Sequence, residues 1–488
     1  MKQKYLFFIP GIAGALLLFF IGWEYNIPAA AWVSYPLLVY SFRNIDRWYK
    51  TLPLILLMII VRFMSISGGW DISLPMTVAF SVLVLLPLIV SLFLDRIFAK
   101  RLSAFTSTLV FPCVYLMLDY LLTYANLGMT FSLVYSQCTF LELIQSASLF
   151  GSWFVGFIVA WFAPVAVLLI SKSKTAADRK PLIAYFTILA VILAFGSLRL
   201  SLSTPQAKTV RIASITESHG DVDYWTITDE ETPKEKAGEY KPQMERIQDN
   251  LFESSQRAAD FGAKIIFWSE GNCPVYEDDY PAFLEKARRF AKDNNVYFMP
   301  AVVEFLYGRT KNNNLAIIIN PQGEIEYRYE KTISWYPSDS DGIIPVIDTP
   351  YGRLSTAICF DMDYPAQILQ ARDADIMLVP GFDTKKIDDF HTRVAFLRGL
   401  ENGFSTVRQS NRGASISADY LGNTLTYQNY FSTDDRIMLS DVPMRGVNTL
   451  YGFTGEIFLW LVLAGLIFII IRLAIRRKRS AGATIQKG

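Results

Sequence analysis

The stretch RLSTAICFDMDYP, residues 353–365, decides the fold of the polar half of this chain. Its apolar residues, among them Leu354 and Ile358, predict a short buried strand. The strand pattern stops at Cys359, and Pro365 marks the start of a helix. A thiol at such a turn lies near free backbone N–H groups, which favour a thiolate and can hold an oxyanion. Because free cysteines are usually buried and inert, Cys359 becomes a candidate nucleophile only if other reactive groups accompany it.

The composition predicts an integral membrane protein with two or three domains. Of the 488 residues, 52% are hydrophobic and only 19% are charged, and the mean hydropathy is +0.27. Soluble domains carry about a quarter charged residues. The net charge of +1 provides no basic field, so no nucleic-acid partner is expected. The four cysteines show no CxxC spacing and there are only two histidines, so neither a metal site nor a cofactor is predicted.

Eight apolar segments are candidate membrane spans, seven before the polar region and one after it. They cover residues 5–23, 28–42, 52–69, 73–94, 104–123, 147–171, 182–200 and 455–474. The expected organisation is a seven-helix transmembrane bundle at 1–204 and an α/β domain at 205–450. A C-terminal transmembrane helix with a basic tail follows at 451–488.

Positive charges alternate between the loops and predict the topology. They follow the second, fourth, sixth and last segments, whereas the intervening loops contain no lysine or arginine. By the positive-inside rule both termini are cytoplasmic, and the region 201–453 lies on the extracytoplasmic side. The charged residues are Arg43, Arg47, Lys50, Arg96, Lys100, Arg101, Lys172, Lys174, Arg179, Lys180, Arg472, Arg476, Arg477, Lys478 and Arg479.

The loop 123–146 is too apolar for an ordinary solvated loop. Two interpretations remain open at this point. The loop either packs on the helical bundle or forms an interfacial lip beside a path for lipid entry.

From residue 209 onward, short strands and amphipathic helices alternate. This mixture of βα units and hairpins predicts an α/β domain of about 240 residues with a mixed sheet. Strands are expected at 210–217, 263–270, 296–305 and 374–381, helices at 243–261, 281–294 and 388–402, and hairpins at 315–331 and 404–425.

Three reactive side chains fall at or just past predicted strand ends, namely Glu270, Lys331 and Cys359. If these strands are neighbours, the side chains converge at one edge of the sheet. A carboxylate can then act as general base for the thiol, and an ammonium can stabilise the thiolate and the oxyanion. The cysteine can attack an acyl carbonyl and form a thioester.

Four stretches resemble signature blocks of the nitrilase, or carbon-nitrogen hydrolase, superfamily, whose members use a Glu-Lys-Cys triad on an αββα sandwich. They are WSEG (268–271), YEK (329–331), ICFDMDYP (358–365) and RGLENGFSTVRQSNRGASISADYLG (398–422). With seven spans before the domain and one after it, the whole chain is similar to the apolipoprotein N-acyltransferases of the bacterial inner membrane. These enzymes transfer an acyl chain from a phospholipid to the α-amino group of the diacylglyceryl-cysteine of apolipoproteins.

The resemblance implies a role for each residue of the constellation. Glu270 would be the base, Lys331 the oxyanion stabiliser and Cys359 the acylated nucleophile. The backbone N–H of Phe360 would complete the oxyanion hole. A phospholipid donor, an apolipoprotein acceptor and a monomeric protein are therefore expected.

Further residues are assigned to the site by the same resemblance. Asp339 and Asp361 occupy positions where the family has glutamates, and Trp225 occupies that of a family tryptophan. Trp335 and Tyr336 lie in a loop, 333–343, that is expected to hold acyl chains together with the loop 273–280.

Other polar residues have simpler interpretations. His391 is expected on a solvated helix face, and Cys273 is expected to be structural. Arg398 and Glu401 have the spacing of an ion pair within one helix. Two other functions remain open, a membrane-anchored amidase that uses water as the acceptor and a non-catalytic receptor or scaffold.

Overall fold

A computed structural model describes the chain over seven stretches. They are residues 7–69, 73–170, 176–203, 208–217, 234–308, 312–334 and 338–485. Trp225, Trp335 and Tyr336 lie outside them. The chain divides into two compact units, one formed by Met1–Ser203 with Thr454–Gly488 and the other by Thr204–Phe453.

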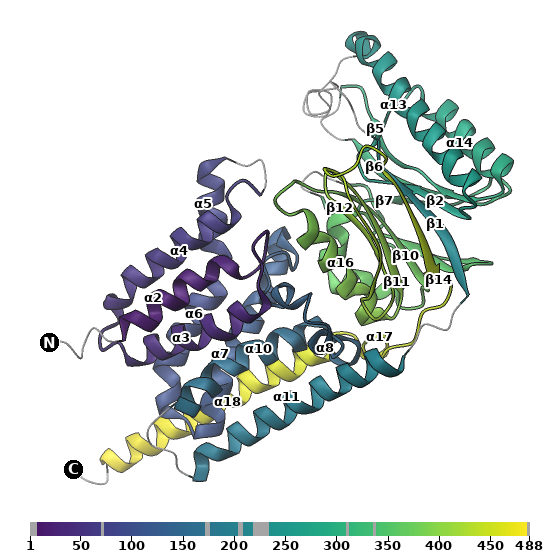
Figure 1. Cartoon of the computed structure of the whole chain (residues 1–488). Coiled ribbons are helices and arrows are strands. Elements are labelled where there is room, and N and C mark those ends of the chain that lie inside the picture. The colour runs from purple at the N-terminus through teal and green to yellow at the C-terminus, as the bar shows by residue number, and fades with distance from the viewer. Residues whose placement is uncertain are drawn as a thin grey trace. The chain divides into compact units, whose positions relative to one another are not determined.

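The first unit is helical (Figure 1). Its main helices are α2 (Phe8–Leu17), α3 (Pro28–Asn44), α4 (Leu52–Ile66), α5 (Leu74–Leu83), α6 (Leu86–Phe98), α7 (Ala104–Leu122), α10 (Ser152–Ile170), α11 (Ala176–Leu202) and α18 (Ile457–Ile485). Shorter turns are η1 (Leu18–Phe20), η2 (Trp48–Thr51), η3 (Ala99–Arg101), η4 (Thr123–Leu127), η5 (Leu133–Gln137), α8 (Leu141–Ile144) and α9 (Ala147–Phe150).

Six helices in the described part of the chain are long and apolar enough to cross a membrane. They run over Trp48–Ile66, Leu74–Arg101, Ala104–Leu127, Ser152–Ile170, Arg179–Leu202 and Ile457–Arg476. The expected count of eight is therefore not confirmed. The first apolar helix stops at Phe20, where Gly22 and Trp23 both adopt positive φ, and α3 has only 17 residues.

The apolar loop 123–146 packs inside the helical unit. Leu133, Val134 and Gln137 are buried, and the Ser132 hydroxyl donates a hydrogen bond of 2.7 Å to the buried Asp119. The structure thus favours the packed segment over the interfacial lip.

Two β-sheets form the centre of the second unit. The eight-stranded sheet has the order β14 (Ile437–Pro443), β1 (Thr209–Ile215), β2 (Ile265–Trp268), β4 (Tyr297–Met299), β6 (Asn313–Ile319), β5 (Ala301–Phe305) and β3 (Cys273–Tyr276), with β7 (Ile325–Glu330) paired to β6. The six-stranded sheet has the order β13 (Thr424–Asn429), β12 (Ala414–Ala418), β11 (Ser405–Asn411), β10 (Ile376–Phe382), β9 (Gly352–Thr356) and β8 (Val346–Thr349). Strands β9, β10 and β11 run parallel, so their carboxyl ends meet at one edge.

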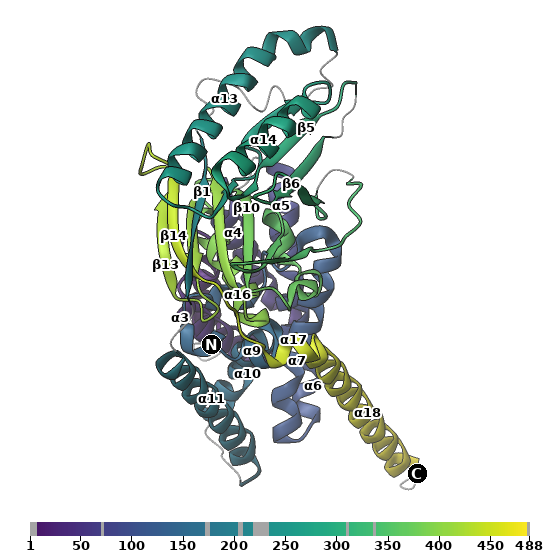
Figure 2. The same cartoon turned by 90° about the vertical axis from the view of Figure 1, so that its right-hand side faces the viewer.

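Helices cover the outer faces of both sheets. Helices α13 (Lys234–Asp260) and α14 (Tyr280–Asn294) pack on the eight-stranded sheet (Figures 1 and 2). Their Phe252 and Phe283 rings lie 6.0 Å apart. Helix α16 (Asp388–Asn402) covers the six-stranded sheet through contacts such as those of Phe396. A large apolar cluster fills the space between the sheets. The predicted α/β sandwich is confirmed.

Most predicted elements of this unit agree with the structure. Helix α16 spans the predicted residues, and both hairpins form. The predicted strand at 296–305 is two strands, because Pro300 separates β4 from β5 and cannot donate a ladder hydrogen bond. Strands β3, β8, β13 and β14 were not predicted, and β8 and β13 lack a continuous apolar pattern because they are edge strands.

Gly403 is required at the end of α16. Its φ of +89° lies in the left-handed region, and a Cβ placed there would overlap the backbone carbonyl of Val447. Gly262 has a similar φ of +84°, yet its Cβ would meet nothing within 4 Å.

We therefore expect Gly403→Ala to destabilise this unit more than Gly262→Ala. Both variants lose about 1 kcal/mol to backbone strain, and Gly403→Ala adds about 1–3 kcal/mol of overpacking. Thermal unfolding of the purified proteins in detergent measures the difference. Equal midpoints for the two variants would contradict the steric argument.

Candidate active site

Cys359 lies on a strained elbow three residues after the end of β9. Its φ of +49° is unusual for a residue with a side chain and costs about 1–2 kcal/mol. The residue begins a short turn, Cys359–Asp363, which leads into the helix Pro365–Ile368. The thiol is 6% exposed and lies 3.5 Å from the carbonyl oxygen of Phe382, so the elbow holds the sulfur at the carboxyl ends of β9 and β10.

Asp361 holds this elbow in place. Its buried carboxylate accepts hydrogen bonds from the Tyr329 hydroxyl (2.6 Å), the Ile333 N–H (2.7 Å) and the Ile358 N–H (3.1 Å). Burial raises the pKa of Asp361 to about 6, against the opposing effects of Lys331 and of these donors. The donors lie in β7 and in the segments that follow β7 and β9, so one side chain connects the elbow to the strand β7.

Glu270 and Lys331 form a buried ion pair across the eight-stranded sheet. Glu270 lies two residues after β2, and Lys331 follows β7 directly. Oε1 of Glu270 accepts hydrogen bonds from Nζ of Lys331 (2.6 Å) and from Nδ2 of Asn314 (2.7 Å). Oε2 of Glu270 is buried and has no hydrogen-bond partner among the described residues. One carboxylate oxygen thus remains free to accept a proton.

The charges around Cys359 set its protonation state. Burial and then the negative charge of Glu270 raise the pKa of the thiol, and this outweighs the opposing effects of Lys331 and Arg408. The pKa of Lys331 also lies above its ordinary value, because Glu270, Cys359 and Asp361 outweigh its burial. The resting sulfur is therefore a neutral thiol. Desolvation is the largest influence on the thiol, and it opposes the thiolate that the turn was expected to favour.

The sequence predicted that the three candidate residues converge at the edge of a single sheet. This prediction is wrong. Glu270 and Lys331 follow strands of the eight-stranded sheet, whereas Cys359 follows β9 of the six-stranded sheet. Strands β2 and β7 are not neighbours either, because β4 and β6 separate them. The site is instead built where the two sheets face each other. Strand periodicity carries no information about which sheet a strand joins.

A second polar cluster lies on the other sheet beside the sulfur. Arg408 of β11 is fully buried, and its Nη2 lies 3.6 Å from Sγ of Cys359. The same guanidinium donates to the carboxylate of Asp383, which directly follows β10. His391 of α16 places Nδ1 2.7 Å from Asp383 and Nε2 2.9 Å from Asp363.

The prediction of a solvated helix face for His391 is therefore wrong. Its side chain is 12% exposed, since this face of α16 points at the carboxyl end of β10. Asp383 offered a usable signal in the sequence, because it directly follows a strand that reads as buried. Arg408 offered none, because it looks like one polar residue within a hairpin strand. The predicted ion pair of Arg398 and Glu401 is confirmed at 3.1 Å and is fully buried.

The remaining predicted residues lie as follows. The Phe360 ring packs edge-on against Tyr364, with centroids 5.5 Å apart. Asp339 is exposed, and its backbone N–H donates to the Glu330 carboxylate at 3.0 Å. Cys273 is fully buried in the apolar cluster beneath α13 and α14, in agreement with a structural role.

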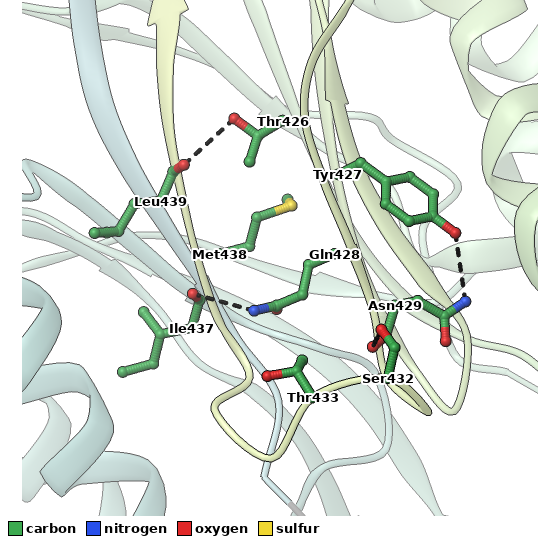
Figure 3. Close-up of a pocket in the computed structure, with 9 residues that line it drawn as sticks. All are labelled: Thr426, Tyr427, Gln428, Asn429, Ser432, Thr433, Ile437, Met438 and Leu439. Carbon is green, nitrogen blue, oxygen red and sulfur yellow. Dashed lines mark hydrogen bonds between the residues drawn. The ribbon is translucent and has the colours of Figure 1, made fainter.

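A surface pocket of about 310 Å³ lies elsewhere in this unit. Figure 3 shows its lining residues on β13, β14 and the turn between them. The hydroxyl of Thr426 donates to the carbonyl of Leu439 across this pocket at 3.3 Å. Glu270, Lys331 and Cys359 do not line it.

We expect His391 to make the stability of this unit depend on pH. Burial lowers the pKa of His391, but Asp363 and Asp383 outweigh it and raise the pKa from 6.5 to about 9. Because the folded state holds the proton more tightly, this stabilisation of roughly 3 kcal/mol is complete below pH 6.5. It disappears as the pH rises through about 9.

Thermal unfolding between pH 6 and pH 10 checks this expectation. The wild-type midpoint should fall over that window, and His391→Gln should lower the midpoint throughout and flatten its pH dependence. The other histidine of the chain provides the control, because His219→Gln should retain the wild-type slope. An unchanged slope in His391→Gln would contradict the assignment.

Three comparisons report which known proteins the second unit is similar to. Residues 233–435 match the family model for carbon-nitrogen hydrolases. "Probable hydrolase nit2" of Schizosaccharomyces pombe is 24% identical over 231 residues, which are 39% of this chain and 84% of that protein. An amidase structure from Nesterenkonia sp. aligns with a TM-score of 0.38 and 16% identity, covering 49% of this chain and 92% of that one.

Apolipoprotein N-acyltransferases are also among the relatives. The apolipoprotein N-acyltransferase of Vibrio vulnificus is 23% identical over 262 residues, which are 46% of this chain. The matched part spans 50% of the length of that acyltransferase. The α/β sandwich that carries Glu270, Lys331 and Cys359 belongs to the carbon-nitrogen hydrolase superfamily.

Proposed function

We propose that this protein is an N-acyltransferase that carries its acyl group as a thioester on Cys359. The donor is a phospholipid, and the acceptor is the α-amino group of the N-terminal diacylglyceryl-cysteine of an apolipoprotein. One observation carries the proposal: a carbon-nitrogen hydrolase domain shares its chain with helices long enough to cross a membrane, five before it and one after it. The similarity to the acyltransferase of Vibrio vulnificus supports the same conclusion.

The first transfer forms the thioester. The free Oε2 of Glu270 takes the thiol proton, and the sulfur of Cys359 attacks the ester carbonyl of the phospholipid. The ammonium of Lys331 and the backbone N–H of Phe360 stabilise the oxyanion. The carbon–oxygen bond then breaks, and Glu270 returns the proton to the departing lysophospholipid.

The second transfer forms the amide. The neutral α-amine of the acceptor attacks the thioester, and Glu270 takes a proton from the attacking nitrogen. The carbon–sulfur bond breaks, and the sulfur leaves as a thiolate that regains its proton from Glu270. Each cycle therefore begins and ends with the proton on Cys359 and with Glu270 paired to Lys331.

The apolar helices supply a reason for placing this chemistry at a membrane. Moving an acyl chain out of a bilayer costs about 0.8 kcal/mol for each CH₂ group, so the site must be brought to the lipid. The loop 333–343 would hold the acyl chains. The expectation that 273–280 is a second such loop is wrong, because Cys273–Tyr276 form the buried strand β3. The charge pattern of the loops supports a topology with both termini in the cytoplasm and the catalytic unit on the extracytoplasmic side. The membrane we propose is the bacterial inner membrane.

A second candidate function is an amidase that uses water as the acyl acceptor. The match to the yeast hydrolase favours it, because that match covers most of the yeast protein. The same three residues would then cleave a small amide and release ammonia or an amine. The two functions differ in the acyl donor and in whether water reaches the thioester.

Intact-mass measurement of the purified protein after incubation with phospholipid tests the acyltransferase. We expect an adduct with the mass of one acyl chain that hydroxylamine removes and that Cys359→Ala abolishes. Glu270→Gln should slow its formation by about 10²–10⁴-fold. Cys273→Ala provides the matched control and should retain the adduct. No adduct with any phospholipid, together with hydrolysis of small amides, would establish the amidase instead.

The loop that carries Trp335 and Tyr336 provides a separate test of the lipid site. Replacing both residues by alanine should slow acyl transfer from phospholipid at subsaturating donor concentrations, because the acyl chains lose apolar contacts. Alkylation of Cys359 by a small reagent should proceed at the wild-type rate. Unchanged acyl transfer would exclude this loop from the lipid site.

A further inference from the structure

We propose that Arg408 is a further catalytic residue, which donates a hydrogen bond to the sulfur of Cys359 and is held there by Asp383, His391 and Asp363. The inference rests on the proposed role of Cys359 as the nucleophile. It applies to both acyl transfers, because the sulfur carries negative charge when it attacks and again when it leaves.

The geometry around the guanidinium supports a direct role at the sulfur. Arg408 is fully buried at the centre of β11, and its Nη2 lies 3.6 Å from Sγ of Cys359. Its Nη1 donates to Asp383 and to the hydroxyl of Thr392. The planar group is thereby fixed from two sides, so one N–H remains directed at the reacting atom.

Its counterions are arranged in a chain. Asp383 bridges Arg408 and Nδ1 of His391, and Asp363 forms a hydrogen bond with Nε2 of the same ring. Both ring nitrogens face carboxylates, which is the arrangement that a doubly protonated imidazolium requires. With His391 protonated, the four residues carry two positive and two negative charges. The cluster then has no net charge, so it does not repel a negatively charged sulfur.

A second cation is needed at this sulfur. Lys331 is already paired with Glu270 at 2.6 Å, and Glu270 itself disfavours a negative charge on Cys359. Arg408 approaches from the other sheet and acts in the opposite direction. Charge-assisted hydrogen bonds in a dry site are stronger than neutral ones. The N–H of Arg408 therefore stabilises the sulfur when the carbon–sulfur bond breaks.

The same position also resembles a metal site. One ligand atom each from Cys359, Asp383 and His391 lies within 4.8 Å of the others. The Nη2 of Arg408 contacts all three, at 3.6 Å from the sulfur and 3.2 Å from both Asp383 and Nδ1 of His391. Cys359 and Asp383 already share a cation, the guanidinium, and a doubly protonated His391 has no lone pair to offer a metal ion.

Alkylation of Cys359 by iodoacetamide, followed by peptide mass spectrometry across pH 6–10, tests the inference without any acyl donor. We expect Arg408→Met to move the profile to higher pH and to lower the rate at pH 8 by at least about tenfold, which corresponds to one pKa unit. Arg408→Lys should recover part of this rate. A profile for folded Arg408→Met that coincides with the wild type would overturn the proposal.

The control comes from the opposite end of the same strands. Arg353 forms an ion pair with Asp375, which lies just before β10, at 3.2 Å. Arg353→Met should leave the alkylation profile unchanged, and thermal unfolding reports whether each variant is folded. If Arg408→Met does not fold, His391→Gln serves as the test variant instead. Slower alkylation of Cys359 with an altered pH dependence then supports the proposal, and a wild-type profile refutes it.

Two outcomes separate this inference from the proposed function. A shifted profile in a protein that forms no thioester supports Arg408 and refutes the acyltransferase. A thioester with an unshifted profile supports the acyltransferase and refutes Arg408.

Discussion

The arrangement of the candidate site depends on one buried carboxylate, that of Asp361. It accepts three hydrogen bonds, from Tyr329 in β7, from Ile333 after β7 and from Ile358 after β9. A cysteine with a left-handed backbone conformation persists only where its surroundings outweigh the strain. The hydrogen bonds of Asp361 provide this stabilisation on one side of Cys359. The side chain of Asp361 is shorter than that of a glutamate, and it suits a position with no exposed surface. Asp361 also connects β7, which Lys331 directly follows, to the elbow.

The electrostatics of the site follow from its depth. Burial keeps the thiol of Cys359 neutral, so a base is required, and Glu270 has one oxygen paired with Lys331 and Asn314 and one oxygen free. Positive charge lies on both sheets, with Lys331 on one and Arg408 on the other. Each is matched by carboxylates, because an unpaired buried charge would be strongly destabilising. The sandwich thereby holds a reactive thiol and its base in one dry place.

Much of the fold could be predicted from local patterns. Helix α16 and both hairpins follow directly from periodicity and from turn residues such as Pro321 and Gly323. The short edge strands β8 and β13 escaped prediction, because exposed edges carry no apolar alternation. The predicted count of eight membrane spans is not confirmed for a related reason. Hydropathy measures composition, whereas a left-handed Gly22–Trp23 turn decides where the first helix stops.

The sequence by itself determined the class of chain, the α/β domain and the identity of Glu270, Lys331 and Cys359 as candidates, because strand ends and residue chemistry are local properties. Only the tertiary structure decided that these residues meet between two sheets. It also buried His391 between two aspartates and brought Arg408 to the sulfur. Such contacts join residues many positions apart, and they depend on which strand enters which sheet. That choice is made by packing over the whole domain, and no local pattern records it.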